Sequence, residues 1–244
     1  MSQEFATFME YLERLKSRYF FTLSAFYAYE GLIELTAPNI VGKEEANKNV
    51  EEIKKYWDFF GPSKEALRVY FFLELAKLFD ASDQSLHVDK IINFTQSNIR
   101  KLSASDFAEF NHDRQFVEEL VKNYRGINND DLESVKSLLT EHANTIGELK
   151  TYRDKYLAHD DLHKLEVQLT GQQIKDLFSV LEKVLNLFSS KLDHSSTMYD
   201  HIEERCKDQT KMIVDRLRRF EPYRLKEIDE QCQRELEQYR QKLS

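Results

Sequence analysis

Glycine and proline are scarce in this chain, and their scarcity limits the folds that it can form. Among 244 residues there are only 6 Gly and 3 Pro, where average usage gives roughly 17 and 12. Tight turns need residues that accept a positive φ or that preset φ, and a β-sheet needs many such turns. A chain so poor in both residues is unsuited to β architecture. We therefore expect an all-α protein.

The overall composition narrows the class further. With 32% charged and 41% hydrophobic residues, the chain is too apolar for disorder and too polar for a membrane protein. Its longest uncharged apolar stretch, residues 19–29, has 11 residues and is too short to span a bilayer. No signal peptide is visible, and two cysteines, Cys206 and Cys232, are typical of a reduced compartment. We expect a cytoplasmic protein with no membrane contact.

Helical periodicity runs through nearly the whole chain. Apolar residues at helical spacing mark a first helix that stops near Pro38, and residues 43–60 form a second helix that Gly61-Pro62 should end. Two capping-box patterns open later helices, at Ser103-x-x-Asp106 and Thr170-x-x-Gln173. The helix after Thr170 carries a regular apolar face, formed by Ile174, Leu177, Leu181, Val184 and Phe188.

The charge balance changes near the C-terminus. Residues 205–244 contain 11 Lys or Arg and 8 Asp or Glu, a net charge of +3, whereas residues 1–204 have a net charge of −11. We therefore predict an up-and-down helical bundle over residues 1–192 and a charged helical extension over residues 193–244. Pro222 should divide that extension into a helical hairpin.

One long helix, expected from about residue 131 to 158, carries polar residues in an apolar stripe. The stripe follows steps of four and three residues and consists of Val135, Leu139, His142, Ile146, Leu149, Arg153 and Tyr156. An arginine on a packing seam is costly unless it is paired. Asp160 and Asp161 follow, and because acids are disfavoured at a helix C-terminus, the helix should end near His159. We expect the chemistry of the protein at this junction.

The segment Tyr152-Arg153-Asp154-Lys155-Tyr156-Leu157-Ala158-His159 resembles the signature of HEPN domains, an Arg and a polar residue followed by a His, here after five intervening residues. With Leu75-Ala76-Lys77-Leu78-Phe79-Asp80 and the preceding long helices, it is most similar to the abortive-infection, AbiU2-like branch. The resemblance covers roughly residues 10–190. It implies a metal-independent endoribonuclease, a toxin or phage-defence effector, that works as a homodimer with both motifs in one cleft and that an antitoxin protein can accompany.

The resemblance also implies residue roles. His159 would move a proton of the ribose 2′-OH or of the leaving 5′-oxygen, Arg153 would hold the phosphate, and Asp154 would orient one of these side chains. Six positions along a helix correspond to about 240° of rotation and about 9 Å of rise. One straight helix would therefore not aim Arg153 and His159 at the same phosphate, so either the chain bends or two copies meet.

Basic residues around the motif are the candidates for RNA binding. Because the net charge is −8, RNA must meet a local basic patch, and the candidates are Lys150, Lys155, Arg216, Arg218 and Arg219. No DNA binding and no cofactor is expected. Some HEPN toxins carry a Tyr two residues after the His, which a nucleotidyltransferase modifies; this chain has Asp161 there, so we expect no such partner.

Other interpretations of the same residues stay open. Arg153 can form a structural ion pair, His159 can be a helix-terminal residue satisfied by the backbone, and His159-x3-His163 is only a weak metal pattern. Exposed charges in 205–244 are typical of solvated helices. The chain is then a catalytically inactive helical dimer that acts as an RNA-binding or protein-interaction module.

Overall fold

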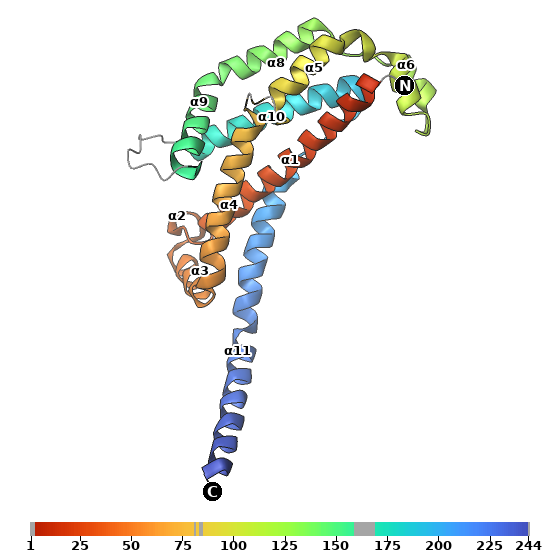
Figure 1. Ribbon diagram of the computed structural model, residues 1–244. Helices are drawn as coiled ribbons and strands as arrows, with labels where there is room; N and C mark the ends of the chain where they lie inside the picture. Colours follow the sequence, from red (N-terminus) through yellow and green to blue (C-terminus); the bar gives the residue numbers. More distant parts are fainter. Residues whose placement is uncertain (1–2, 81, 83–84, 159–168, 244) are drawn as a thin grey trace. The chain divides into compact units, whose positions relative to one another are not determined.

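Every regular element in the described part of the chain is a helix (Figure 1). The computed structural model describes residues 3–80, 82, 85–158 and 169–243. The all-α class predicted from the shortage of glycine and proline is therefore confirmed.

The described residues form the following helices. Their bounds are α1 (Gln3–Glu34), α2 (Pro38–Val41), α3 (Lys43–Lys55), α4 (Trp57–Leu78), α5 (Val88–Asn98), η1 (Ile99–Lys101), α6 (Ala104–Phe110), α7 (Val117–Lys122), α8 (Asn129–Glu141), α9 (Ala143–Tyr152), η2 (Arg153–Ala158), α10 (Gly171–Leu192) and α11 (His201–Leu243).

The chain forms two compact units that are interleaved in the sequence. Unit 1 comprises residues 1–26 and 67–202, and unit 2 comprises residues 27–66 and 203–244. Helices α1, α4 and α11 each contribute residues to both units. The predicted domains, 1–192 and 193–244, stay a prediction, because compactness divides the chain at other positions.

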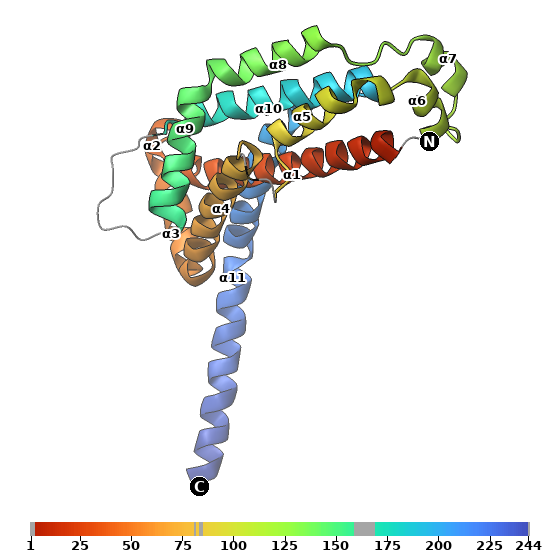
Figure 2. The same cartoon turned by 45° about the horizontal axis from the view of Figure 1, so that its top comes forward.

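Unit 1 has an aromatic-rich core built on α1, α4 and α10. The rings of Phe8 and Phe188 lie 5.7 Å apart, and those of Tyr19 and Phe178 lie 5.9 Å apart. Helix α8 packs beside α5 and α10 (Figures 1 and 2). The predicted face of α10 is buried along its length, formed by Ile174, Leu177, Leu181, Val184 and Phe188.

The two predicted capping sites are confirmed. Thr170 Oγ1 accepts a hydrogen bond from the Gln173 amide at 3.2 Å, and Gln173 Oε1 accepts one from the Thr170 amide at 2.9 Å. Ser103 Oγ accepts from the Asp106 amide at 3.3 Å. Both side chains satisfy amides that would otherwise lack partners at a helix N-terminus.

The boundary predicted at Gly61-Pro62 is wrong. Helix α3 ends at Lys55, and α4 begins at Trp57 and continues through Gly61 and Pro62. A side chain on Gly61 would meet the Trp57 indole at 3.0 Å, so this glycine makes room for the ring that folds over it. Pro62 lies early in the helix, where it removes only one backbone hydrogen bond.

The long helix predicted for residues 131–158 is divided into three segments. Helix α8 ends at Glu141, His142 adopts φ −103° and ψ 10°, and α9 begins at Ala143. From Arg153 to Ala158 the backbone forms a π-helical turn, η2. The apolar stripe that the sequence suggested is therefore interrupted at His142, and the turn type changes at Arg153.

The predicted C-terminal hairpin is also wrong, because α11 is a single helix with Pro222 inside it. A proline in a helix interior removes one backbone hydrogen bond but does not force the chain to reverse. The flanking residues are mostly Glu, Arg, Lys, Gln and Leu, which are strong helix formers. Their preference keeps the helix continuous on both sides of the proline.

Unit 2 joins the C-terminal part of α1 to α11 through a close contact and a cluster of charges. A side chain on Gly31 would lie 3.3 Å from Lys207 Cα, so the glycine allows the two backbones to approach. Lys207 Nζ pairs with Glu30, Glu34 and Glu203 at 2.7–2.8 Å. Val214 of α11 is buried.

Candidate functional site

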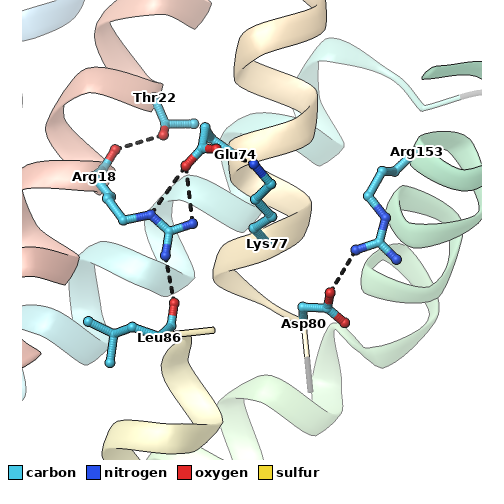
Figure 3. A network of polar contacts seen from close by, with 7 residues as sticks. All are labelled: Arg18, Thr22, Glu74, Lys77, Asp80, Leu86 and Arg153. Atoms are coloured by element: carbon cyan, nitrogen blue, oxygen red, sulfur yellow. Dashed lines mark hydrogen bonds and ion pairs between the residues drawn. The ribbon is translucent and has the colours of Figure 1, made fainter. Parts of the chain in front are cut away.

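Arg153 lies where α9 changes into the π-helical turn η2. Such turns are rare and frequently occur at functional sites. Its guanidinium is bound by two carboxylates of unit 1. Nη1 lies 2.9 Å from Asp80 Oδ2, and Nε lies 2.8 Å from Asp154 Oδ1. Figure 3 shows the Asp80 contact reaching Arg153 from the end of α4.

The two carboxylates fix the charge of the arginine. The hydrogen bond that Arg153 donates to Asp154 raises the pKa of Arg153, burial opposes this shift, and the hydrogen bond donated to Asp80 adds to it. The guanidinium is therefore charged at every relevant pH. The hydrogen bonds of Arg153 to the described residues use Nε and Nη1, and none of these residues binds Nη2, which has two N–H donors.

A polar network joins α1 to α4 a few residues before Asp80 in the sequence. Arg18 binds Glu74 Oε2 through Nε at 3.2 Å and through Nη2 at 3.1 Å, and it donates to the Leu86 carbonyl at 2.6 Å (Figure 3). Burial raises the pKa of Glu74, but Lys77 and Arg18 outweigh burial, so the net shift is downward. The network ties α1 to α4 and to the chain segment that enters α5.

Tyr152, the residue before the arginine, ties the end of α9 to α4. Its hydroxyl accepts a hydrogen bond from Arg68, and its ring lies 4.5 Å from the Phe72 ring. The end of α9 is thus anchored beside the last turns of α4, which brings Arg153 within reach of Asp80.

A groove of about 390 Å³ lies in the same unit. Its walls come from α5, α8 and α9, and Phe79, the neighbour of Asp80, also lines it. The groove is lined by apolar residues together with two lysines, Lys136 and Lys150, and one acid, Asp89. Lys136 is bound to Glu133 and Gln96, each at 3.0 Å. Lys150, one of the predicted RNA-binding residues, therefore lies in a recess.

The other predicted site residues are distributed as follows. Lys155 lies in η2 and is half-buried. Arg216 and Arg219 are exposed on α11 of unit 2, whereas Arg218 binds Glu45 at 2.8 Å and also Asn49. His159 lies outside the described residues, as do Asp160, Asp161 and His163. Arg153 and Asp154 are thus the part of the predicted motif that the structure brings together, and Asp80 is an additional partner of Arg153.

Asp80 and His87 are site residues that the motif search did not assign. Asp80 belongs to the segment 75–80 that supports the resemblance to HEPN domains. Its position directly after an apolar helix was the sequence signal that could have identified it as a site residue. His87 is buried, and its Nδ1 accepts from the Lys90 amide at 3.2 Å, which caps α5. Burial lowers the pKa of His87, an effect that the charges of Asp89 and Asp80 oppose. No sequence pattern marked this histidine.

The described residues contain no group of three or more His, Cys, Asp or Glu side chains placed to hold a metal ion. Among the helices of the described ranges, none combines the length and apolarity needed to cross a membrane.

The fold and this site define a class of protein, an all-helical bundle in which an Arg-Asp pair follows a late helix. Residues 5–213 match the sequence profile of the HEPN AbiU2 family, described as AbiU2. The chain therefore belongs to the HEPN AbiU2 family, as the motif suggested. No curated protein and no solved structure is significantly similar to it. Residues 214–244 lie outside the family match.

Proposed function

We propose that this protein is a metal-independent endoribonuclease of the HEPN type that acts as a toxin or phage-defence effector in the cytoplasm. The observation that carries the proposal is the charged Arg153, oriented by Asp80 and Asp154, with Nη2 unoccupied by any described residue. Membership of the HEPN AbiU2 family supports the same conclusion.

Arg153 would bind the scissile phosphate. A guanidinium presents N–H donors in a planar fork that matches phosphate oxygens. Because Nη1 and Nε are held by carboxylates, the phosphate would approach Nη2 and the second N–H of Nη1. The charge of Arg153 would then stabilise the additional negative charge of the transition state.

His159 would provide the proton transfer. In the proposed reaction, the 2′-oxygen forms a bond to phosphorus while the bond from phosphorus to the 5′-oxygen breaks. One group removes the 2′-OH proton and one protonates the 5′-oxygen, which leaves a cyclic phosphate and a 5′-hydroxyl end. A histidine with a pKa near neutrality suits either role. DNA lacks the 2′-OH and would not be cleaved.

The groove beside Phe79 is the proposed path of the RNA strand. Lys150 and Lys136 would face phosphates there, and Lys155 lies close in sequence to Arg153. Arg216, Arg218 and Arg219 remain proposed RNA contacts, with Arg218 the weakest because Glu45 and Asn49 already bind it.

A homodimer would complete the site. Arg153 and His159 are six positions apart, so two copies can place the arginine of one and the histidine of the other on one phosphate. An antitoxin protein is a further proposed partner, because the resemblance implies one.

The test is cleavage of a labelled RNA by the purified protein in the presence of EDTA. We expect Arg153→Ala and His159→Ala each to lower the cleavage rate by about a hundredfold or more. Arg100→Ala and His112→Ala, which change exposed residues outside the motif, should leave it unchanged. A substrate with a single 2′-deoxy position should resist cleavage at that position. Cleavage that survives both motif substitutions, or that EDTA abolishes, would contradict the proposal.

The pairing of Arg153 with two acids also favours a second function. An arginine held by Asp80 and Asp154 can serve packing alone, and the chain is then a catalytically inactive helical dimer that binds RNA or protein. This alternative predicts that the protein cleaves no RNA and that Arg153→Ala and His159→Ala bind and assemble like the parent. Toxicity of the expressed parent but not of His159→Ala would exclude it.

A further inference from the structure

The C-terminal part of α11 is a helix without packing support among the described residues. Residues 222–242 are exposed at every position, and Figure 1 shows this segment as the blue end of α11. In proteins most of the stability of a helix comes from packing of its apolar face against another surface. The segment lies outside the family match, so the HEPN fold does not account for it.

This segment has one apolar face. Leu225, Ile228, Cys232, Leu236 and Tyr239 fall within an arc of about 80° on a helix of 3.6 residues per turn. Leu225, Ile228, Leu236 and Tyr239 are each 43–64% exposed. Such a narrow stripe is typical of a coiled-coil seam and too narrow for the core-facing side of a globular helix.

The stripe continues a face that is already used for packing. Val214, which is buried in unit 2, lies eleven positions before Leu225, and Leu225 lies eleven positions before Leu236. An eleven-residue repeat keeps the same helix face toward a partner over many turns, with a slight right-handed supercoil. The face that packs within unit 2 therefore reappears after Pro222 with nothing among the described residues to cover it.

We propose that a second copy of this chain covers the face, so that the segments 222–243 of two protomers form a parallel, in-register coiled coil. This contact is independent of the dimer proposed for the Arg153 and His159 cleft, because it lies in unit 2.

The charges that flank the stripe support a second copy as the occupant. In a parallel pair, charged residues that flank the seam on one side of a helix face those that flank it on the other side of the partner helix. Arg224 then faces Asp229 of the partner subunit, and Glu235 faces Arg240 of the partner subunit. Each pair is of opposite charge and occurs twice by symmetry. Arg224 also binds Glu221 of its own helix. This contact keeps the Arg224 side chain on the side of the seam where the pairing places it.

The net charge and the orientation agree with this pairing. Residues 222–243 contain five basic and five acidic residues, whereas the whole chain carries −8, so self-association here meets no net repulsion. An antiparallel pair centred on Cys232 would bring Arg224 to the same end as Lys242 of the partner subunit, which is unfavourable. The parallel arrangement also places the two Cys232 side chains opposite each other.

Cysteine cross-linking of the full-length protein tests the proposal. With the oxidant diamide, we expect Cys206→Ser to form a covalent dimer through Cys232, and Cys232→Ser to form none. Leu236→Cys in a background that lacks both native cysteines should also form a covalent dimer. An antiparallel pair centred on Cys232 would place position 236 opposite Ile228 and give no such product. Failure of either cross-link at micromolar protein overturns the parallel coiled coil.

A matched pair of charge substitutions provides the second readout. Ile228→Asp places a charge in the seam, whereas Gln238→Asp places one outside it. In the Cys206→Ser background we expect Ile228→Asp to lower the yield of the Cys232 dimer at least tenfold and Gln238→Asp to leave it unchanged. Arg153→Ala should leave it unchanged as well, which separates this contact from the proposed ribonuclease site. Equal yields for all three variants would overturn the proposal.

Discussion

Replacement of Asp80 by Asn tests whether the ion pair between Arg153 and Asp80 stabilises the fold. The substitution would keep the shape of the side chain and one acceptor oxygen, but it would remove the charge that Arg153 Nη1 meets at 2.9 Å. The side chains of Arg153 and Asp80 are 18% and 30% exposed, so the pair is only partly withdrawn from water. Breaking a fully buried pair costs about 3–5 kcal/mol, and an exposed pair contributes about 0.2–1 kcal/mol.

The expected loss for Asp80→Asn lies between these limits and toward the lower one. Asp154 still binds Nε at 2.8 Å, so the guanidinium keeps one carboxylate and is not left without a partner. We expect a loss of about 1.5 kcal/mol, which corresponds to a fall in Tm of about 3–6 °C for a chain of this size.

Thermal unfolding followed by circular dichroism measures this change. Asp154→Asn is the matched control, because its side chain is 54% exposed and its removal should cost less than about 1 kcal/mol. Salt at about 1 M should reduce the difference between parent and Asp154→Asn more than that between parent and Asp80→Asn. An Asp80→Asn variant that unfolds at the temperature of the parent would refute the reasoning.

Three further substitutions probe other features of the chain. Because burial lowers the pKa of His87 below its unfolded value of about 6.5, the unfolded state takes up the proton first and stability falls as pH drops below that value. Asn at position 87 keeps a capping side chain but does not titrate, so the Tm of His87→Asn should fall less than that of the parent between about pH 7.5 and 5.5. Equal falls in Tm would show that His87 does not cause the loss of stability at low pH. Gly147 of α9 is exposed with nothing within 4 Å of an added side chain, so Gly147→Ala should raise Tm by about 1–4 °C, and a decrease would point to a neighbouring copy at this position. Pro222→Ala supplies an amide that can donate to the Arg218 carbonyl, so hydrogen exchange should slow in the turn around position 222. Unchanged exchange would show that the proline does not weaken this turn.

Much of the fold was predictable because it depends on local residues. The shortage of turn-forming residues excludes sheets, and the apolar face of α10 and its Thr170 cap follow from spacing along one helix. The breaks between helices were less predictable. Gly61-Pro62 was expected to end a helix, yet α4 continues through both residues, and the Trp57 ring lies against the glycine. Pro222 was expected to reverse the chain, but α11 is continuous through the proline, with strong helix formers on both sides.

The candidate site divides in the same way. The sequence by itself determined that Arg153 needs a partner, since a charge in an apolar stripe is unstable alone, and its spacing to His159 indicated the HEPN family. Only the tertiary structure identified the partner as Asp80, 73 positions away, and showed that Tyr152 joins α9 to α4 through Arg68 and Phe72. Contacts between distant segments depend on how whole helices pack, and no local pattern of residues encodes that packing.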